Sequence, residues 1–133
     1  MKILLLVLAP LFMTIPNNRV DISWLDGQWQ GLGYQPYTSG EKTWTIDLKC
    51  NTAKDKFTIE YPSLDCGGKW TVVESFENRV IFREKIQEGI YNCMPTGIVI
   101  VTRVDDDNIS YSYFVEKNGK RSLDSFSTLK RIK

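Results

Sequence analysis

The chain has 133 residues, of which 42% are hydrophobic and 12% aromatic, and its formal net charge is +1 at pH 7. This length suits one domain with one core, and a charge so close to zero provides no electrostatic attraction to nucleic acid or anionic membranes. The chain contains no histidine, which excludes histidine-dependent triads, histidine metal sites and a histidine pH switch. We expect no nucleic-acid partner, no metal and no cofactor.

The N-terminal segment predicts export. Residues 2–13 hold one lysine followed by an apolar run, which is about the length of a signal-peptide core and too short to cross a bilayer. The alternative is a strand of the core, but the run does not alternate and Pro10 interrupts it. We therefore assign residues 1–18 to a signal peptide and residues 19–133 to a single secreted or periplasmic domain, with no membrane span in the mature chain.

The rest of the chain alternates between apolar and polar residues in short runs separated by turn residues, which is typical of antiparallel strands. Closure of eight such strands removes exposed edges, so we predict an all-β, eight-stranded up-and-down antiparallel barrel of residues 19–133. The first strand is expected at 27–34. The positions that define the other strands are Trp44, Ile46, Leu48 and Cys50; Phe57, Ile59 and Tyr61; Trp70 and Val72; Val80, Phe82 and Ile86; Ile98, Ile100 and Val104; Ile109, Tyr111, Tyr113 and Val115; and Ser127, Leu129 and Arg131.

This topology predicts the pairing of the cysteines. Alternate connections of an up-and-down barrel lie at the same end, and Cys66 and Cys93 fall in two connections that share one end, as a disulfide requires. Cys50 ends the second strand at the opposite end and is expected to be a small buried apolar residue. The alternative for Cys50 is an intermolecular disulfide or a reactive thiol. The connections at the end with the disulfide are 35–42, 62–68, 87–97 and 117–120.

The two ends of the predicted barrel carry a further pattern. The segment Gly27-Gln-Trp29 begins the first strand, and Arg131 lies near the end of the last strand. This combination resembles the calycin superfamily, which includes the lipocalins, fatty-acid-binding proteins and avidins. The resemblance implies that the indole of Trp29 closes one end of the barrel and that the Arg131 guanidinium stacks over it.

Four motifs lie along the mature chain, and the two around the paired cysteines are the specific ones. They are W-x-G at 29–31, Y-P-S-L-x-C-G-G at 61–68, F-x-E-x-I-x-x-G-x-x-x-C at 82–93 and L-x-R at 129–131. In these motifs the chain resembles a family of small exported bacterial β-domains, which occur alone after signal peptides and as extracytoplasmic parts of bacterial receptor-type Ser/Thr kinases. The resemblance implies an exported sensing or binding module in which Glu84 and the Cys66–Cys93 pair are structural, and it implies no particular ligand or activity.

Glu84 is a charged residue in phase with Val80, Phe82 and Ile86, on a face that is expected to point inward. A carboxyl group there must be paired, hydrogen-bonded or protonated, so we predict a structural role, with orientation of a ligand as the alternative. Glu74 is in phase with Trp70 and Val72, and two inward glutamates would suggest the acid–base chemistry of glycosidases. Because so small a barrel has little room for a substrate, we predict that the protein is not an enzyme.

The two ends of the barrel are expected to differ in function. Short polar turns at 51–55, 76–78 and 105–108 form a sealed end; the last of these is acidic but lacks the glycine and distal glutamate of an EF-hand loop, so we expect a solvated turn. The connections at the other end, the mouth, carry aromatic residues suited to recognition, with capping of the core as the alternative. The residues predicted to bind a partner there are Tyr34, Tyr37 and Tyr91.

We therefore expect a non-enzymatic, exported binding or sensing module that engages a small molecule or an envelope component at the mouth. The alternative is a protein inhibitor of an extracellular hydrolase of the protease or lysozyme type. An empty interior favours the first function, and a packed barrel with a projecting loop favours the second.

Overall fold

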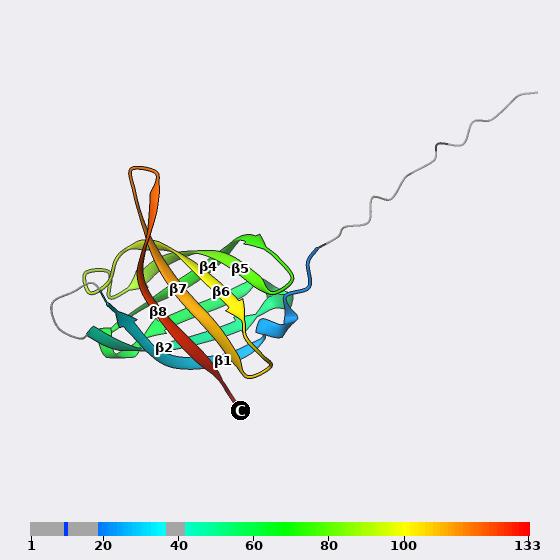
Figure 1. The fold of residues 1–133 in the computed structure, drawn as a ribbon, viewed down its shortest axis with the longest axis horizontal. Helices are drawn as coiled ribbons and strands as arrows, with labels where there is room; N and C mark the ends of the chain where they lie inside the picture. Colours follow the sequence, from blue (N-terminus) through cyan, green and yellow to red (C-terminus); the bar gives the residue numbers. More distant parts are fainter. Residues whose placement is uncertain (1–9, 11–18, 37–41) are drawn as a thin grey trace, which may run out of the picture.

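The computed structural model describes residue 10 and residues 19–36 and 42–133. Eight strands form a closed barrel in which each strand is antiparallel to the next and β8 pairs with β1 (Figure 1), which confirms the predicted fold. The predicted signal peptide, apart from residue 10, and Tyr37 lie outside the described residues. The strands are β1 (Gly27–Gln35), β2 (Lys42–Asn51), β3 (Lys56–Tyr61), β4 (Cys66–Ser75), β5 (Arg79–Glu88), β6 (Thr96–Arg103), β7 (Asn108–Lys117) and β8 (Lys120–Ile132).

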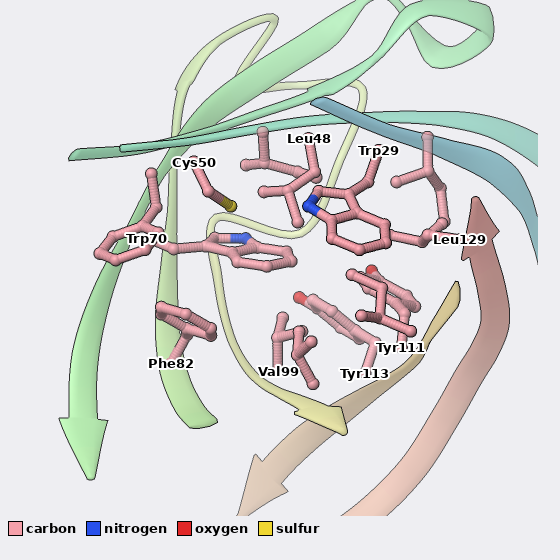
Figure 2. Packing of buried hydrophobic residues seen from close by; sticks show 14 of the residues in the cluster. Trp29, Leu48, Cys50, Trp70, Phe82, Val99, Tyr111, Tyr113 and Leu129 are labelled. Carbon is pink, nitrogen blue, oxygen red and sulfur yellow. The ribbon is translucent and has the colours of Figure 1, made fainter. Parts of the chain in front are cut away.

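Inward-facing side chains from all eight strands fill the interior, and aromatic rings form its centre (Figure 2). The ring centroid of Phe82 lies 4.9 Å from that of Phe57 and 5.0 Å from that of Trp70. The inward faces predicted for β2, β3, β5 and β7 pack in this core. On β2 and β3 a polar residue separates each pair of inward apolar residues, which makes the period of two plain in the sequence.

The face predicted for β6 is wrong. Val99 and Val101 are the residues of this strand that pack in the core, whereas Ile98 belongs to the other face and pairs with Arg83 and Phe114. Residues 98–101 are all apolar, so the sequence contains no alternation that distinguishes the two faces. Val104, also predicted on this face, is exposed beyond the end of the strand.

The predicted inward position of Glu74 is also wrong. Val72 pairs with Phe82 and Glu74 with the next residue of β5, Ile81, so Val73 is an extra residue in a β-bulge. A bulge shifts the side-chain phase by one, and Glu74 is therefore exposed. The two glutamates Glu74 and Glu84 do not face each other inside the barrel.

The sealed end is closed by a single 3-10 turn, η1 (Ser23–Leu25), that the sequence analysis did not predict because one turn has no period to detect. The indole of Trp29 donates a hydrogen bond to the Leu25 carbonyl over 2.9 Å. The Arg131 guanidinium lies over the Trp29 ring, 4.2 Å from its centroid, and donates to the carbonyls of Trp24, Asp26 and Asp106. The expected stacking of Trp29 and Arg131 is thus present, with η1 as the third component.

Two further 3-10 turns connect strands, η2 (Thr52–Lys54) at the sealed end and η3 (Pro62–Leu64) at the mouth. The carboxylate of Asp26 receives hydrogen bonds from the backbone N–H of Thr52 over 2.6 Å and from its hydroxyl over 2.9 Å. This contact joins η1 to η2. No helix in the described part of the chain is long and apolar enough to cross a membrane.

The predicted disulfide joins Cys66 to Cys93, with their Cα atoms 6.4 Å apart. Cys66 is the first residue of β4 rather than part of the preceding connection, and Cys93 lies between β5 and β6. The β7–β8 hairpin projects beyond the barrel at the same end (Figure 1). Its turn residues, Asn118 and Gly119, have φ angles of 52° and 74°, as a tight two-residue hairpin turn requires.

Candidate functional site

A cavity of about 180 Å³ opens at the mouth of the barrel, between β1, β2, β3, β5, β7, β8 and the two connections that precede β4 and β6. The residues that line it belong to three groups: an acidic floor and rim, aromatic walls, and the connection that carries the disulfide. They are Gln35, Trp44, Tyr61, Leu64, Glu84, Asn92, Cys93, Met94, Tyr111, Tyr113, Asp124 and Ser125.

The floor of the cavity is a hydrogen-bonded network around Glu84, whose side chain is only 1% exposed. The hydroxyl of Tyr61 donates to Glu84 Oε1 over 2.6 Å, and the indole of Trp70 donates to the same oxygen over 2.9 Å. The hydroxyls of Tyr61 and Tyr111 are 2.7 Å apart. The buried carboxyl thus has the hydrogen-bonding partners that its inward phase implied, and they are aromatic rather than basic.

Burial determines the protonation of this network. It raises the pKa of Glu84 above the usual 4.5, against the effect of the hydrogen bonds from Tyr61 and Trp70. Burial also raises the pKa values of Tyr61 and Tyr111 well above 10, and the nearby Glu84 raises both further. The two phenols therefore remain protonated at physiological pH and act as hydrogen-bond donors.

A second bulge directs an acidic residue into the cavity. Tyr113 pairs with Ser125 and Phe114 pairs with Leu123, so Asp124 is an extra residue of β8. Consecutive residues of a regular strand point to opposite faces, but here both Asp124 and Ser125 line the cavity. Bulges commonly redirect side chains next to functional sites.

The carboxyl group of Asp124 and the hydroxyl of Ser125 differ in their hydrogen bonding. Gln35 Nε2 donates to Asp124 Oδ1 over 2.9 Å and so holds one of its two carboxyl oxygens. The hydroxyl of Ser125 is buried and has no hydrogen-bond partner among the described residues. An unsatisfied buried hydroxyl is costly, so its position in a cavity wall is informative about what the cavity binds.

Two glycines make room for aromatic walls. A Cβ atom on Gly33 would lie 2.6 Å from the indole of Trp44, its partner across the β1–β2 ladder. A Cβ atom on Gly97 would lie 2.2 Å from the hydroxyl of Tyr113. That hydroxyl donates to the Thr96 carbonyl over 3.1 Å, which fixes the ring at the cavity wall. Side chains at positions 33 and 97 would displace both walls.

The rim next to the disulfide is held in several ways. Asn92 donates from its backbone to the Gly89 carbonyl over 2.9 Å and from its side chain to the Asp65 carbonyl over 3.2 Å. The backbone bond lies within the β5–β6 connection. Because Asp65 precedes Cys66 and Asn92 precedes Cys93, the side-chain bond joins the same two segments as the disulfide. The rim is therefore formed before any ligand arrives.

The three tyrosines predicted to bind a partner are not brought together. Tyr34 faces outward from β1, where its ring packs edge-on against Phe126 at 5.6 Å. Tyr91 is 96% exposed on the connection between β5 and β6 and does not line the cavity. Tyr37 lies outside the described residues.

Four of the residues that line the cavity were not predicted as site residues from the sequence: Trp44, Tyr113, Asp124 and Ser125. Trp44 and Tyr113 had been assigned to the inward face, and only their position near the strand ends at the mouth distinguishes them from core residues. Asp124 could not be found from its phase, because the bulge that redirects it has no sequence signal of its own.

Cys50 is free and buried at the sealed end, with its sulfur directed into the core (Figure 2). Burial raises the pKa of its thiol, and the nearby Asp26 raises it further. The thiol therefore remains protonated, which fits a packed residue better than a reactive one.

The acidic turn at 105–108 forms its own hydrogen bonds. Asp105 Oδ1 accepts from the backbone N–H of Asp107 and from the side chain of Asn108, both over 2.9 Å, and these bonds lower the pKa of Asp105. Over the described residues, no group of three or more histidine, cysteine or acidic side chains is arranged to hold a metal ion.

Comparison with protein-family models matches none of them, and comparison with curated proteins finds no significant relative. The class of the protein therefore comes from its own architecture. It is a closed, eight-stranded antiparallel β-barrel with one disulfide and a partly acidic, aromatic cavity at the mouth.

Proposed function

We propose that the protein is a non-enzymatic, exported binding or sensing module that engages a small molecule or an envelope component at the mouth of a calycin-like barrel. The observation that carries this proposal is the mouth cavity, which has fixed aromatic walls and polar groups directed into it. Ligand sites in proteins are typically concave, largely pre-formed and lined by apolar and aromatic residues with a few oriented polar groups.

Three features support export. The disulfide between Cys66 and Cys93 is stable in an oxidising compartment and rare in the cytosol. The apolar segment at 2–13 has the length of a signal-peptide core. The motifs at 61–68 and 82–93 resemble those of exported bacterial β-domains, and two of their residues, Glu84 and Cys93, line the cavity.

The position of Glu74 supports a non-enzymatic function. A pair of catalytic carboxyl groups must flank one substrate bond, but Glu74 is exposed on the outside of the barrel wall. Glu84 is engaged by Tyr61 and Trp70, which is an arrangement suited to holding a carboxyl group rather than to moving its proton in each turnover.

Protein-observed NMR tests the proposed site. A small-molecule library or envelope extract is titrated into the protein, and the expected result is a set of shift changes confined to amides around the cavity, including Glu84 and Ser125. Trp44→Leu removes a cavity wall and should weaken binding, whereas Tyr34→Leu changes an outward ring and should not. Shift changes confined to the turn at 105–108 would refute binding at the mouth.

One observation favours the alternative, an inhibitor of an extracellular hydrolase. Tyr91 is 96% exposed and its neighbour Ile90 is 50% exposed, on a connection held by the disulfide. A stiff loop with apolar tips loses little entropy on binding a protein cleft. In this case Tyr91→Ala should abolish inhibition in a panel of proteases and lysozymes, and Trp44→Leu should leave it unchanged.

A further inference from the structure

We propose that the mouth cavity selects a small organic cation, namely an amine of about the size of one ring whose ammonium group lies between Glu84 and Asp124. This inference rests on the proposed binding function, and it names the class of ligand. It is supported by the charge of the cavity lining, the geometry of β8, the polar groups without hydrogen-bond partners and the size of the cavity.

The first step is the charge of the lining. Glu84 and Asp124 both line the cavity, and no lysine or arginine is among the described residues that line it. An anionic ligand would therefore lie next to two acidic side chains with no basic partner among the described residues, whereas a cationic ligand would meet opposite charge in a partly buried site. The lining disfavours carboxylates and phosphates as ligands.

The second step is the geometry of β8. In a regular strand Asp124 would point away from the cavity that Ser125 lines, and the bulge places both on the same side. Packing does not require a carboxylate at this point, because the neighbouring inward positions, Ser125 and Ser127, are small and uncharged. The bulge therefore brings a negative charge into the mouth that the core does not use.

The third step is the set of acceptors that remain. Both hydrogen bonds to Glu84 reach Oε1, and the bond from Gln35 reaches Oδ1 of Asp124. The hydroxyl of Ser125 has no partner among the described residues. Among the described residues, the second oxygens of Glu84 and Asp124 accept no side-chain hydrogen bond. An ammonium group carries up to three N–H donors and no acceptor, so it matches these oxygens and this hydroxyl.

The fourth step is size and wall chemistry. The cavity of about 180 Å³ is slightly larger than an engineered cavity of roughly 150 Å³ that binds benzene. Trp44, Tyr61, Tyr111 and Tyr113 supply aromatic surfaces around it. Aromatic faces attract cations as well as rings, so the walls favour an ammonium group and the ring that carries it.

Binding of a cation should depend on pH through Glu84. The titratable groups around Glu84 are Tyr61 on β3, Tyr111 and Tyr113 on β7, and Asp124 on β8; burial raises the pKa values of all three phenols, so these remain neutral. An ammonium group favours the ionised carboxylate, and the proton of Glu84 then passes to the solvent. Affinity should therefore increase as the pH rises above 4.5, the ordinary pKa of this group.

The experiment compares three probes of matched size: benzylamine, benzyl alcohol and benzoate. Each is titrated into the full chain at pH 7 and followed by amide shifts. We expect benzylamine to bind at least tenfold more tightly than benzyl alcohol, with shifts around Glu84 and Ser125, and benzoate to cause no shifts there. Equal or tighter binding of benzyl alcohol or benzoate would overturn the inference but leave binding at the mouth intact. If none of the three shifts a cavity amide, the inference about the ligand class fails, whereas binding at the mouth is refuted only by the titration with the library or envelope extract.

Variants separate the charge from the fold. Asp124→Asn keeps the residue in the bulge and its acceptor for Gln35, and it should weaken benzylamine about tenfold while leaving benzyl alcohol unchanged. Glu84→Gln should remove the pH dependence of benzylamine binding. Glu74→Gln makes the same change on the outer wall and is the matched control. The inference is wrong if Asp124→Asn binds benzylamine as tightly as the original protein does.

Discussion

At the scale of single residues, Glu84 links the core to the mouth cavity. It is buried, it receives hydrogen bonds from Tyr61 and Trp70 on one oxygen, and it forms the floor of the mouth cavity. Its inward phase among Val80 and Phe82 was enough to predict burial from the sequence. Its partners could not be predicted, because they come from β3 and β4 and depend on the register of three strands.

A first prediction concerns the Glu84→Gln variant. The pKa of Glu84 is raised by burial, so the folded state binds more protons than the unfolded state above pH 4.5, and the free energy of unfolding falls as the pH rises through this window. The stabilising contribution is complete below pH 4.5. The variant should lose about 1–3 kcal/mol through altered hydrogen bonds, and its stability should depend less on pH.

Chemical denaturation between pH 4 and pH 8 measures both effects. Glu74→Gln, on the outer wall, should retain the pH dependence of the original protein. The prediction is contradicted if the free energy of unfolding depends on pH in the same way for the original protein and for Glu84→Gln, because Glu84 would then have the same pKa in the folded and unfolded states.

At the scale of elements, the positions of the strands could be predicted from the sequence more reliably than the face to which each side chain belongs. The inward face of β3 was predicted correctly because Thr58 and Glu60 separate its apolar residues, whereas the continuous apolar run of β6 concealed which of its faces is inward. The bulge at Val73 turns Glu74 outward, and the bulge at Asp124 adds a residue of β8 that lines the cavity. Since a bulge changes the count of residues between pairs, and not their chemistry, alternation read from one strand cannot reveal it.

A second prediction concerns the contact between η1 and β8. Arg131→Lys keeps the charge but loses the planar group that stacks on Trp29 and donates to three carbonyls. We expect a loss of about 1–3 kcal/mol in the free energy of unfolding, measured by urea denaturation. Arg103→Lys, which changes an exposed pair with Asp106, should have an effect below about 1 kcal/mol. Equal effects of the two variants would argue against a structural role of the stack.

At the scale of the whole molecule, the topology and the disulfide were predictable because they depend on the order of strands and not on their details. Parity alone placed Cys66 and Cys93 at one end and Cys50 at the other. The cavity was not predictable in the same way, since its residues come from six strands and two connections and no local pattern unites them.

A third prediction concerns the disulfide. The bond joins residues separated by 27 positions, and closure of such a loop contributes roughly 3.5 kcal/mol on the chain-entropy estimate. The double variant Cys66→Ser, Cys93→Ser should lose stability of this order, whereas Cys50→Ser should retain the bond. Peptide mapping without reductant should recover Cys66 linked to Cys93, and Cys50 should react with alkylating reagents only after unfolding. A link from Cys50 to either partner would contradict the strand order.

The bulge at Asp124 has a consequence for how such a site can arise or disappear. A bulge adds one residue to one strand of a pair. Insertion or deletion of a single codon in frame would therefore be enough to create or remove the acidic side chain at the rim of the mouth. A substitution in β8 changes the side chain at one position but not the face to which that position belongs. An insertion or deletion changes which positions of β8 face the cavity. Among barrels of this kind, the length of β8 would therefore distinguish binding from non-binding forms better than the identity of its residues.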